Sequence, residues 1–252
     1  MNSFRLIVDS PAAGVWNMAV DEALLESAAD SGIATLRVYT WSEPTLSLGY
    51  FQAAADREQH PASRTCTLVR RASGGGAILH HHELTYSLAL PDGDGRAATA
   101  RRLYEACHQA WIAVLRELDI TATMYGSNPA CGVVDSPTAG EPFLCFQRRT
   151  CFDIVCQGAK IVGSAQRRRR GGILQHGSVL LARSPFAPEL PGIRDLTAGT
   201  IAAAELSSSW PPRLAEAMDY RLQPGELSPR ETENAEIHCR QRFAAKEFQD
   251  RR

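Results

Sequence analysis

The 252-residue sequence lacks several features that would place it quickly in a structural or functional class. No run of about twenty apolar residues is present, so no membrane-spanning helix is predicted. The seven cysteines include no Cys-x-x-Cys pair and no Cys/His spacing of the structural zinc type, so neither a disulfide framework nor a metal site is predicted. Neither sign of charge dominates, and the net charge of -1 argues against a nucleic-acid-binding domain.

The start of the sequence also lacks the pattern of a secretory signal, because its first residues lead directly into strand-like Leu6-Ile7-Val8. We therefore expect a cytosolic, cytoplasmic protein with no membrane partner. What the sequence does contain is a composition typical of globular proteins, with 44% hydrophobic and 22% charged residues. This length fits one large α/β domain, which we favour over two small ones.

A glycine triplet, Gly74-Gly75-Gly76, is present without either common nucleotide-binding motif. The segment Arg70 to Ala77 matches neither the P-loop, which needs Gly-Lys-Ser/Thr, nor the dinucleotide fingerprint Gly-x-Gly-x-x-Gly. Three glycines let the backbone approach a ligand and present N–H groups to it, while flanking arginines supply charge. Taken alone, however, such a triplet is most often only a flexible turn.

Hydrophobic periodicity predicts alternating strands and helices. We expect a helix capped by Asn17, an amphipathic helix from Leu103 to Leu118, and a final helix opened by the capping box that begins at Ser228. A Gly, Pro, Ser and Asn-rich loop is predicted at 126–144, with Gln157-Gly158 and Arg167 to Gly172 as hairpin connections. The expected strands are 4–8, 35–40, 45–50, 66–70, 84–90, 151–157, 160–165 and 173–181.

Several single residues leave two interpretations open. His80, His81 and His82 suggest a metal, but neighbours on an extended segment point to opposite faces, which favours structural roles. His176 is similar, since a lone histidine entering a strand is more often structural than a base. Lys160 lies among small residues from Gly158 to Ser164, so a ligand-contacting role and an ordinary solvent-facing role are equally supported.

Together, these segments resemble the biotin/lipoate A/B protein ligase family, of the lipoate-protein ligase A type. Any one segment is weak, but their order along nearly the whole chain is specific. The matching segments are Asn17 with Asp21-Glu22, Trp41, Leu48-Gly49-Tyr50-Phe51-Gln52, Arg70-Arg71-x-Ser73-Gly74-Gly75-Gly76-Ala77 with His80, Lys160-Ile161-Val162-Gly163-Ser164-Ala165-Gln166, and Gln175-His176-Gly177-Ser178.

Within that family, Cys145-Phe146 lies fifteen positions before Lys160 and resembles the branch of octanoyltransferases that work through a cysteine. Cys151-Phe152 repeats the dipeptide, but only Cys145 has the family spacing, so Cys151 and Cys156 are expected to be buried thiols. The C-terminal segment resembles the close of the catalytic domain. The resemblance therefore implies a single catalytic domain over 1–252, without the small C-terminal accessory domain.

The resemblance implies an α/β (α+β) fold, in which helices flank a mixed, largely antiparallel sheet around a tunnel for an octanoyl or lipoyl chain. It implies that Cys145 and Lys160 are catalytic and that no metal is bound. A nearby Lys160 ammonium would favour the Cys145 thiolate, and N–H groups of the glycine loop could hold the oxyanion. The implied substrate-binding residues are Arg71, Ser73, Gly74, Gly75, Gly76, Ala77, Ile78, Leu79, His80, Gly163, Ser164, Ala165 and His176.

The implied reaction moves octanoyl from octanoyl-acyl carrier protein through a Cys145 thioester to a lysine of a lipoyl carrier domain. That domain would belong to the glycine cleavage H protein or to the acyltransferase subunit of a 2-oxoacid dehydrogenase. A thioester donor already holds the energy for amide formation, so no cofactor is required. Nucleic acid is not an expected partner.

Three alternatives remain open. An ATP-dependent lipoate-protein ligase would need ATP and Mg²⁺ and would leave Cys145 incidental. An amidotransferase would move octanoyl between carrier proteins, also through a cysteine. The arginine run 167–170 suggests a non-catalytic binding module, although such runs are more often solvated turns. If the run is functional in an enzyme, it would dock acidic acyl carrier protein.

Overall fold

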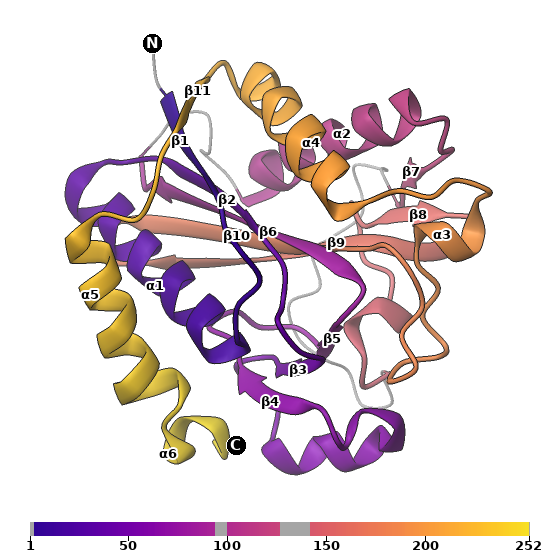
Figure 1. Cartoon of the computed structure of the whole chain (residues 1–252), viewed down its shortest axis with the longest axis horizontal. Coiled ribbons are helices and arrows are strands. Elements are labelled where there is room, and N and C mark those ends of the chain that lie inside the picture. Colours follow the sequence, from indigo (N-terminus) through magenta and orange to yellow (C-terminus); the bar gives the residue numbers. More distant parts are fainter. Residues whose placement is uncertain (1–2, 94–99, 127–141, 252) are drawn as a thin grey trace.

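The computed structural model describes residues 3–93, 100–126 and 142–251, which form a larger and a smaller β-sheet with helices packed around them (Figure 1). The larger sheet comprises β1 (Ser3–Val8), β2 (Thr35–Tyr39), β6 (Glu83–Pro91), β7 (Thr123–Met124), β8 (Ile154–Cys156), β9 (Ala159–Arg169), β10 (Gly172–Leu180) and β11 (Arg221–Pro224). The smaller sheet comprises β3 (Thr45–Leu48), β4 (Thr67–Arg70) and β5 (Ile78–His80).

The larger sheet is mixed and largely antiparallel, as predicted. Its strand order is β11-β1-β2-β6-β10-β9-β8-β7. Only the pairs of β1 with β11 and with β2 are parallel among these strands. The remaining pairs are antiparallel, and β6, β10 and β9 lie side by side in the centre of the sheet, where they contribute one wall of the candidate site.

Helices cover both faces of the larger sheet (Figure 1). On one face α2 packs against α4, and Trp111 stacks on Trp210 with ring centroids 4.6 Å apart. On the other face α1 packs against α5. The bounds are α1 (Gly14–Ser31), α2 (Ala100–Glu117), α3 (Ile193–Leu196), α4 (Ala203–Met218), α5 (Pro229–His238) and α6 (Lys246–Gln249), with 3₁₀ turns at Ala54–Gln59, Pro61–Ser63 and Cys145–Gln147 and a π-turn at Cys239–Phe243.

The cores on the two faces of the larger sheet differ in polarity. The core under α2 and α4 is almost wholly apolar, and each large side chain fully buried there contributes about 1.5–3 kcal/mol. The face under α1 also buries polar side chains, because Asn17, Asp21 and Glu22 of that helix are withdrawn from solvent. No helix in the described ranges is long and apolar enough to cross a membrane.

The cap predicted at Asn17 is wrong, because α1 begins one turn earlier, after Ala13. Asn17 is instead buried within the helix, where its side-chain amide donates to the carbonyl oxygens of Ala12 and Thr40. The earlier start is possible because Gly14 lies where a Cβ would meet Trp41 and Thr45 at 2.9 Å. Local sequence could not show this close packing.

The prediction that the hairpin connection extends from Arg167 to Gly172 is also wrong, because the connection is shorter. Strand β9 continues to Arg169 and pairs with β10 as far as Gly172, so only Arg170 and Gly171 form the turn. Their φ values of 49° and 87° are left-handed, as a two-residue hairpin turn of this hand requires. The connection predicted at Gln157-Gly158 is confirmed, with φ values of 47° and 80°.

Three further predictions have different outcomes. The capping box at Ser228 is confirmed, since its hydroxyl accepts from the N–H of Glu231 and its own N–H donates to the Glu231 carboxylate. The strand predicted at 151–157 begins only at Ile154, because Phe152 has a left-handed φ of 74°. Most of the loop predicted at 126–144 lies outside the described residues.

Candidate active site

A cavity lies where the smaller sheet and the glycine loop face the β9–β10 hairpin. Its walls come from segments far apart in the sequence, including the N-terminal half of α1, the end of β2, β5 and the start of β6. The lining residues are Met18, Tyr39, Trp41, Arg71, Gly74, Gly75, Ile78, His80, Thr85, Cys145, Phe146, Gly163, Ser164, Ala165, His176, Gly177 and Ser178.

One wall of the cavity is built by residues that lie opposite each other on antiparallel strands. Gly163 of β9 pairs with Ser178 of β10, and Ala165 pairs with His176. Directly opposed residues share a face of the sheet, so these four line one surface. The absence of a side chain at Gly163 is required, because a Cβ there would lie 2.4 Å from Cε of Lys160 and 2.8 Å from its Nζ.

Cys145 opens the short 3₁₀ turn Cys145–Gln147 and is partly exposed in the cavity. Its backbone is fixed against the end of the glycine loop, since its N–H donates to the carbonyl of Ala77 at 2.7 Å. The N–H of Ala77 in turn donates to Phe143 O at 3.0 Å. These two bonds place the Cys145 thiol beside the loop predicted to bind substrate.

Lys160 lies between the thiol and a carboxylate. Its Nζ is 3.7 Å from Sγ of Cys145 and 2.9 Å from Oδ2 of Asp153. Burial by itself would lower the pKa of Lys160, but the negative charges of Cys145 and Asp153 outweigh it and raise that pKa. Lys160 is therefore held as an ammonium next to the thiol.

Asp153 is a site residue that the sequence reasoning missed. Its Oδ2 also accepts hydrogen bonds from the N–H and the hydroxyl of Thr150, at 2.7 and 3.1 Å. It lies just before β8, which pairs with the start of β9, so the hairpin brings it to Lys160. The available signal was an acidic residue within the first strand, 151–157, of a predicted hairpin.

The segment that carries Asp153 is held by a buried histidine of α2. His108 Nδ1 lies 2.5 Å from the carbonyl oxygen of Phe152, and its Nε2 lies 2.6 Å from the hydroxyl of Ser164. Burial lowers the pKa of His108, so the ring is neutral. A neutral ring donates from Nδ1 and accepts at Nε2, which connects the Asp153 segment to the cavity wall.

Arg71 is a second buried cation of the cavity. Its two terminal nitrogens donate to Ser47 O and to the carbonyls of Gly74 and Gly76, at 3.1, 2.6 and 2.7 Å. Burial lowers its pKa to about 10, and the charge of Cys145 is the largest opposing influence. Arg71 therefore both shapes the glycine loop and places a positive charge near the thiol.

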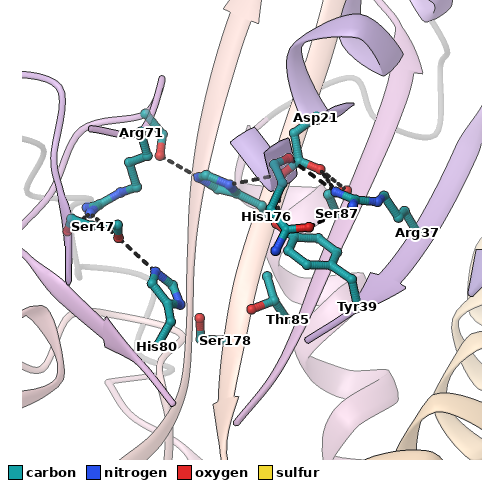
Figure 2. Close-up of polar contacts among 12 residues, drawn as sticks. Asp21, Arg37, Tyr39, Ser47, Arg71, His80, Thr85, Ser87, His176 and Ser178 are labelled. Atoms are coloured by element: carbon teal, nitrogen blue, oxygen red, sulfur yellow. Dashed lines mark hydrogen bonds and ion pairs between the residues drawn. The ribbon is translucent and has the colours of Figure 1, made fainter. Parts of the chain in front are cut away.

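His176 belongs to a buried polar network rather than standing alone. Its Nε2 is 2.5 Å from the Ser73 hydroxyl, and its Nδ1 is 3.6 Å from Oδ2 of Asp21. Figure 2 shows Asp21 between His176 and Arg37, whose Nη1 lies 2.9 Å from Asp21 Oδ1. Burial would raise the pKa of Asp21, but the neighbouring His176 ring and the Arg37 charge lower it.

His80 lies in a second network across the cavity. Its Nε2 is 2.7 Å from the Ser47 hydroxyl (Figure 2). Its Nδ1 is 2.6 Å from Oε1 of Glu83, and its ring stacks on Trp41. His81 and His82 stack on each other elsewhere and contact Ser184 and Arg183 O. No group of metal-binding side chains gathers in the described ranges.

Not every predicted substrate-binding residue reaches the cavity surface. Ser73 lies behind His176, while Gly76, Ala77 and Leu79 pack outside the lining. Lys160 is not among the lining residues, although its Nζ lies 3.7 Å from Sγ of Cys145. Arg71, Gly74, Gly75, Ile78, His80, Gly163, Ser164, Ala165, His176 and Cys145 all line the cavity.

Two expectations about neighbouring residues need correction. Most of the arginine run does not form a free basic loop, because Arg167 donates to Ala72 O, Arg168 pairs with Asp92, and Arg169 pairs with buried Glu22. Cys151 is buried as expected but is disulfide-bonded rather than a free thiol. Cys156 is a buried free thiol, as predicted.

A family model for the lipoyl protein ligase A/B catalytic domain matches residues 14–185, which include the cavity and both Cys145 and Lys160. The chain belongs to this family. The glycine loop, the Lys160 segment and the His176 segment, which lie around one cavity, all fall within the region that matches the lipoyl protein ligase A/B catalytic domain. It also confirms the resemblance drawn from the sequence motifs.

The chain is also similar to individual proteins named as octanoyltransferases. Octanoyltransferase LipM of Kyrpidia tusciae is 33% identical over 94% of this chain and 94% of its own length. Octanoyltransferase LipM of Brevibacillus brevis is 30% identical over the full length of both chains. Octanoyltransferase LipM of Moorella thermoacetica is 40% identical over 71% of this chain and 65% of its own.

Solved structures agree on the lipoyl protein ligase fold. Lipoate-protein ligase A bound with ATP has a TM-score of 0.78 at 20% identity, covering 98% of each chain. The bipartite lipoate protein ligase of Thermoplasma acidophilum has a TM-score of 0.76 at 18% identity, covering 99% of this chain and 97% of its own. Similarity at these identities shows the fold alone, so the chemistry must be argued from the site.

Proposed function

We propose that this chain is an octanoyltransferase of lipoate biosynthesis that carries the octanoyl group on Cys145. The observation that carries the proposal is the Sγ of Cys145 in the cavity, 3.7 Å from a buried ammonium that is itself paired with Asp153. An ATP-dependent ligase has no use for this thiol–lysine pair. The curated LipM relatives support the same choice.

The first half-reaction follows from the charge on Lys160, which favours the Cys145 thiolate by direct attraction. The thiolate attacks the carbonyl carbon of the donor thioester, and the donor carbon–sulfur bond breaks. Lys160 gives its proton to the departing donor thiolate. The products are octanoyl-Cys145, a donor thiol and neutral Lys160, so protons and charges balance.

Acylation itself prepares Lys160 for the second half-reaction. The Cys145 charge is the largest influence that raises the Lys160 pKa, and it disappears when the sulfur becomes part of a thioester. Burial then acts against the ammonium with only Asp153 opposing it, so Lys160 releases its proton more readily. Neutral Lys160 accepts a proton from the incoming lysine amine as that amine attacks, and Cys145 leaves as thiolate.

The donor we propose is octanoyl-acyl carrier protein, and the acceptor is a lysine of a lipoyl carrier domain. Candidate acceptors are the glycine cleavage H protein and the acyltransferase subunit of a 2-oxoacid dehydrogenase. The thioester-to-amide exchange is favourable in free energy, because an amide is more stable than a thioester. The proposed reaction therefore requires neither ATP nor a metal.

The deciding experiment combines the purified protein with octanoyl-acyl carrier protein and an apo lipoyl domain, without ATP or Mg²⁺. We expect octanoylated domain by intact mass, together with a transient octanoyl adduct on Cys145. Free octanoate or lipoate should not replace the donor, because a free carboxylate needs adenylation before an amine can displace its oxygen. Product formed only from free acid and ATP would contradict the transferase assignment while leaving the fold unchanged.

A further inference from the structure

The five N–H groups of Arg71 are not used equally. Nη1 donates to the carbonyl oxygen of Ser47 and reaches its hydroxyl at 3.4 Å, while Nη2 donates to the carbonyls of Gly74 and Gly76. The remaining donor, Nε–H, is buried and has no hydrogen-bond acceptor among the described residues. A buried donor without an acceptor is unfavourable, so an exception in a native site calls for a partner that the described residues do not supply.

The surroundings of Arg71 indicate where such an acceptor would come from. Arg71 is 2% exposed, lines the same cavity as Cys145, and is attracted by the charge on that sulfur. An acyl group on Cys145 would bring one new acceptor into this space, its carbonyl oxygen. Within the described ranges, the Nε–H group is thus an unpartnered donor of a residue that lines the same cavity as the reacting sulfur.

The glycine loop is less suited to this role than its sequence suggested. The carbonyl oxygens of Gly74 and Gly76 both point at the Arg71 guanidinium, so the loop presents acceptors on that side. The two bonds also fix the orientation of the guanidinium plane before any substrate arrives. A donor that is already oriented needs no reorganisation when charge develops in the transition state.

We propose that Nε–H of Arg71 donates a hydrogen bond to the carbonyl oxygen of the acyl group on Cys145 and stabilises the oxyanion formed there. The inference rests on the proposed function. When the Cys145 thiolate adds to the donor thioester, the carbonyl π electrons move to oxygen, and the negative charge passes from sulfur to that oxygen. When the oxyanion collapses, the same electrons re-form the carbonyl and the donor thiolate leaves. Arg71 faces the charge on sulfur first and on oxygen afterwards.

The test uses the carbonyl band of the acyl-enzyme. Octanoyl-N-acetylcysteamine labelled with ¹³C at its carbonyl is used to acylate Cys145, and the thioester band is isolated by ¹³C/¹²C infrared difference. We expect the band at lower wavenumber than in the free thioester, since a hydrogen bond weakens the C=O bond. In Arg71→Lys the band should return towards the free position, because lysine has no N–H in the place of Nε. An identical band in both proteins would overturn the inference.

Arg70→Lys is the matched control. Arg70 is an equally buried neighbour, but its guanidinium binds backbone carbonyls of the C-terminal segment and of residues 49–52. It should lower stability and leave the carbonyl band unchanged. In Arg71→Lys, kcat with the same small thioester should fall about 10²–10³-fold with little change in KM, as expected for loss of one oxyanion donor.

A second measurement needs only the wild-type protein. The ¹⁵Nε–H resonance of Arg71, assigned through its own side-chain carbons, should move downfield when Cys145 is acylated. If the resonance does not move although the adduct is confirmed, the proposed role of Arg71 is overturned and the proposed function is not. Absence of any adduct on Cys145 by intact mass instead contradicts the proposed function.

Discussion

Nζ of Lys160 lies 2.9 Å from Oδ2 of Asp153, and each side chain is only 3% exposed. Separating the opposite charges of such a buried pair costs free energy, because each charge would be left unpaired in a medium of low polarity. The pair therefore holds the ammonium at one place, 3.7 Å from Cys145. The position of Asp153 is what makes Lys160 a charged neighbour of the thiol rather than a solvent-facing side chain.

Replacing Cys145 should remove the nucleophile without disturbing the fold. We expect Cys145→Ser to lower octanoyl transfer by at least roughly a thousandfold, because a hydroxyl is a far weaker nucleophile near neutral pH. Cys156→Ser is the control, as a buried free thiol whose pKa is raised by burial. It should keep transfer activity with a modest stability loss. An adduct that persists by mass spectrometry in Cys145→Ser would show that another residue carries the acyl group.

Asp153→Asn should act on Lys160. Without the carboxylate, one of the two negative charges that raise the Lys160 pKa is lost, so the ammonium beside Cys145 is stabilised less. We expect iodoacetamide to alkylate Cys145 more slowly at pH 7 in this variant than in the wild type. Asp92→Asn removes the surface partner of Arg168 instead and should leave the rate unchanged. Equal pH–rate profiles for wild type and Asp153→Asn would show that the carboxylate does not act on the thiol.

Glu231 gives the protein a stability contribution that depends on pH. Burial acts against its charged form, but hydrogen bonds from Arg5, Ser27 and Ser228 lower its pKa to about 2, below the ordinary value of 4.5. A lowered folded-state pKa stabilises the fold above pH 4.5, and that contribution is lost as the pH falls towards 2. Glu231→Gln should therefore be less stable than wild type in urea at pH 7, and the difference should shrink progressively between pH 4.5 and 2. A difference that stays constant over this range would contradict the assignment.

The hairpin turn at Arg170-Gly171 contains an avoidable strain. Arg170 has a φ of 49°, which costs an ordinary L-residue about 1–2 kcal/mol, and asparagine followed by glycine is the favoured pair for this turn. Arg170→Asn should raise the free energy of unfolding by a few tenths to about 1 kcal/mol. The comparison is Arg168→Asn, which loses the surface ion pair with Asp92 and should not stabilise. Urea unfolding monitored by tryptophan fluorescence measures both variants.

The sequence by itself determined the fold class, the family and most of the residues around the cavity. Alternation of apolar residues from Leu84 to Leu90 was enough to place a strand, because strand side chains alternate between faces, but it did not show that both faces of β6 are buried. The Ser228 capping box likewise fixed a helix start through contacts only three residues apart. The segments at Gly74 and Lys160 were informative because their small residues match the close approach of a ligand to the backbone.

Tertiary structure alone decided which side chains act together. Asp153 could not be assigned to Lys160 from spacing, since the left-handed Phe152 and the β8–β9 hairpin set their distance. The arginine run appeared to be a free loop until the buried carboxylate of Glu22, about 150 positions away, supplied its partner. The Nε–H of Arg71 is left without an acceptor among the described residues because the carbonyls of Ser47, Gly74 and Gly76 accept from the two terminal nitrogens instead. Local sequence encodes periodicity and caps because those interactions span a few residues, whereas charge pairing across a cavity depends on the packing of distant segments.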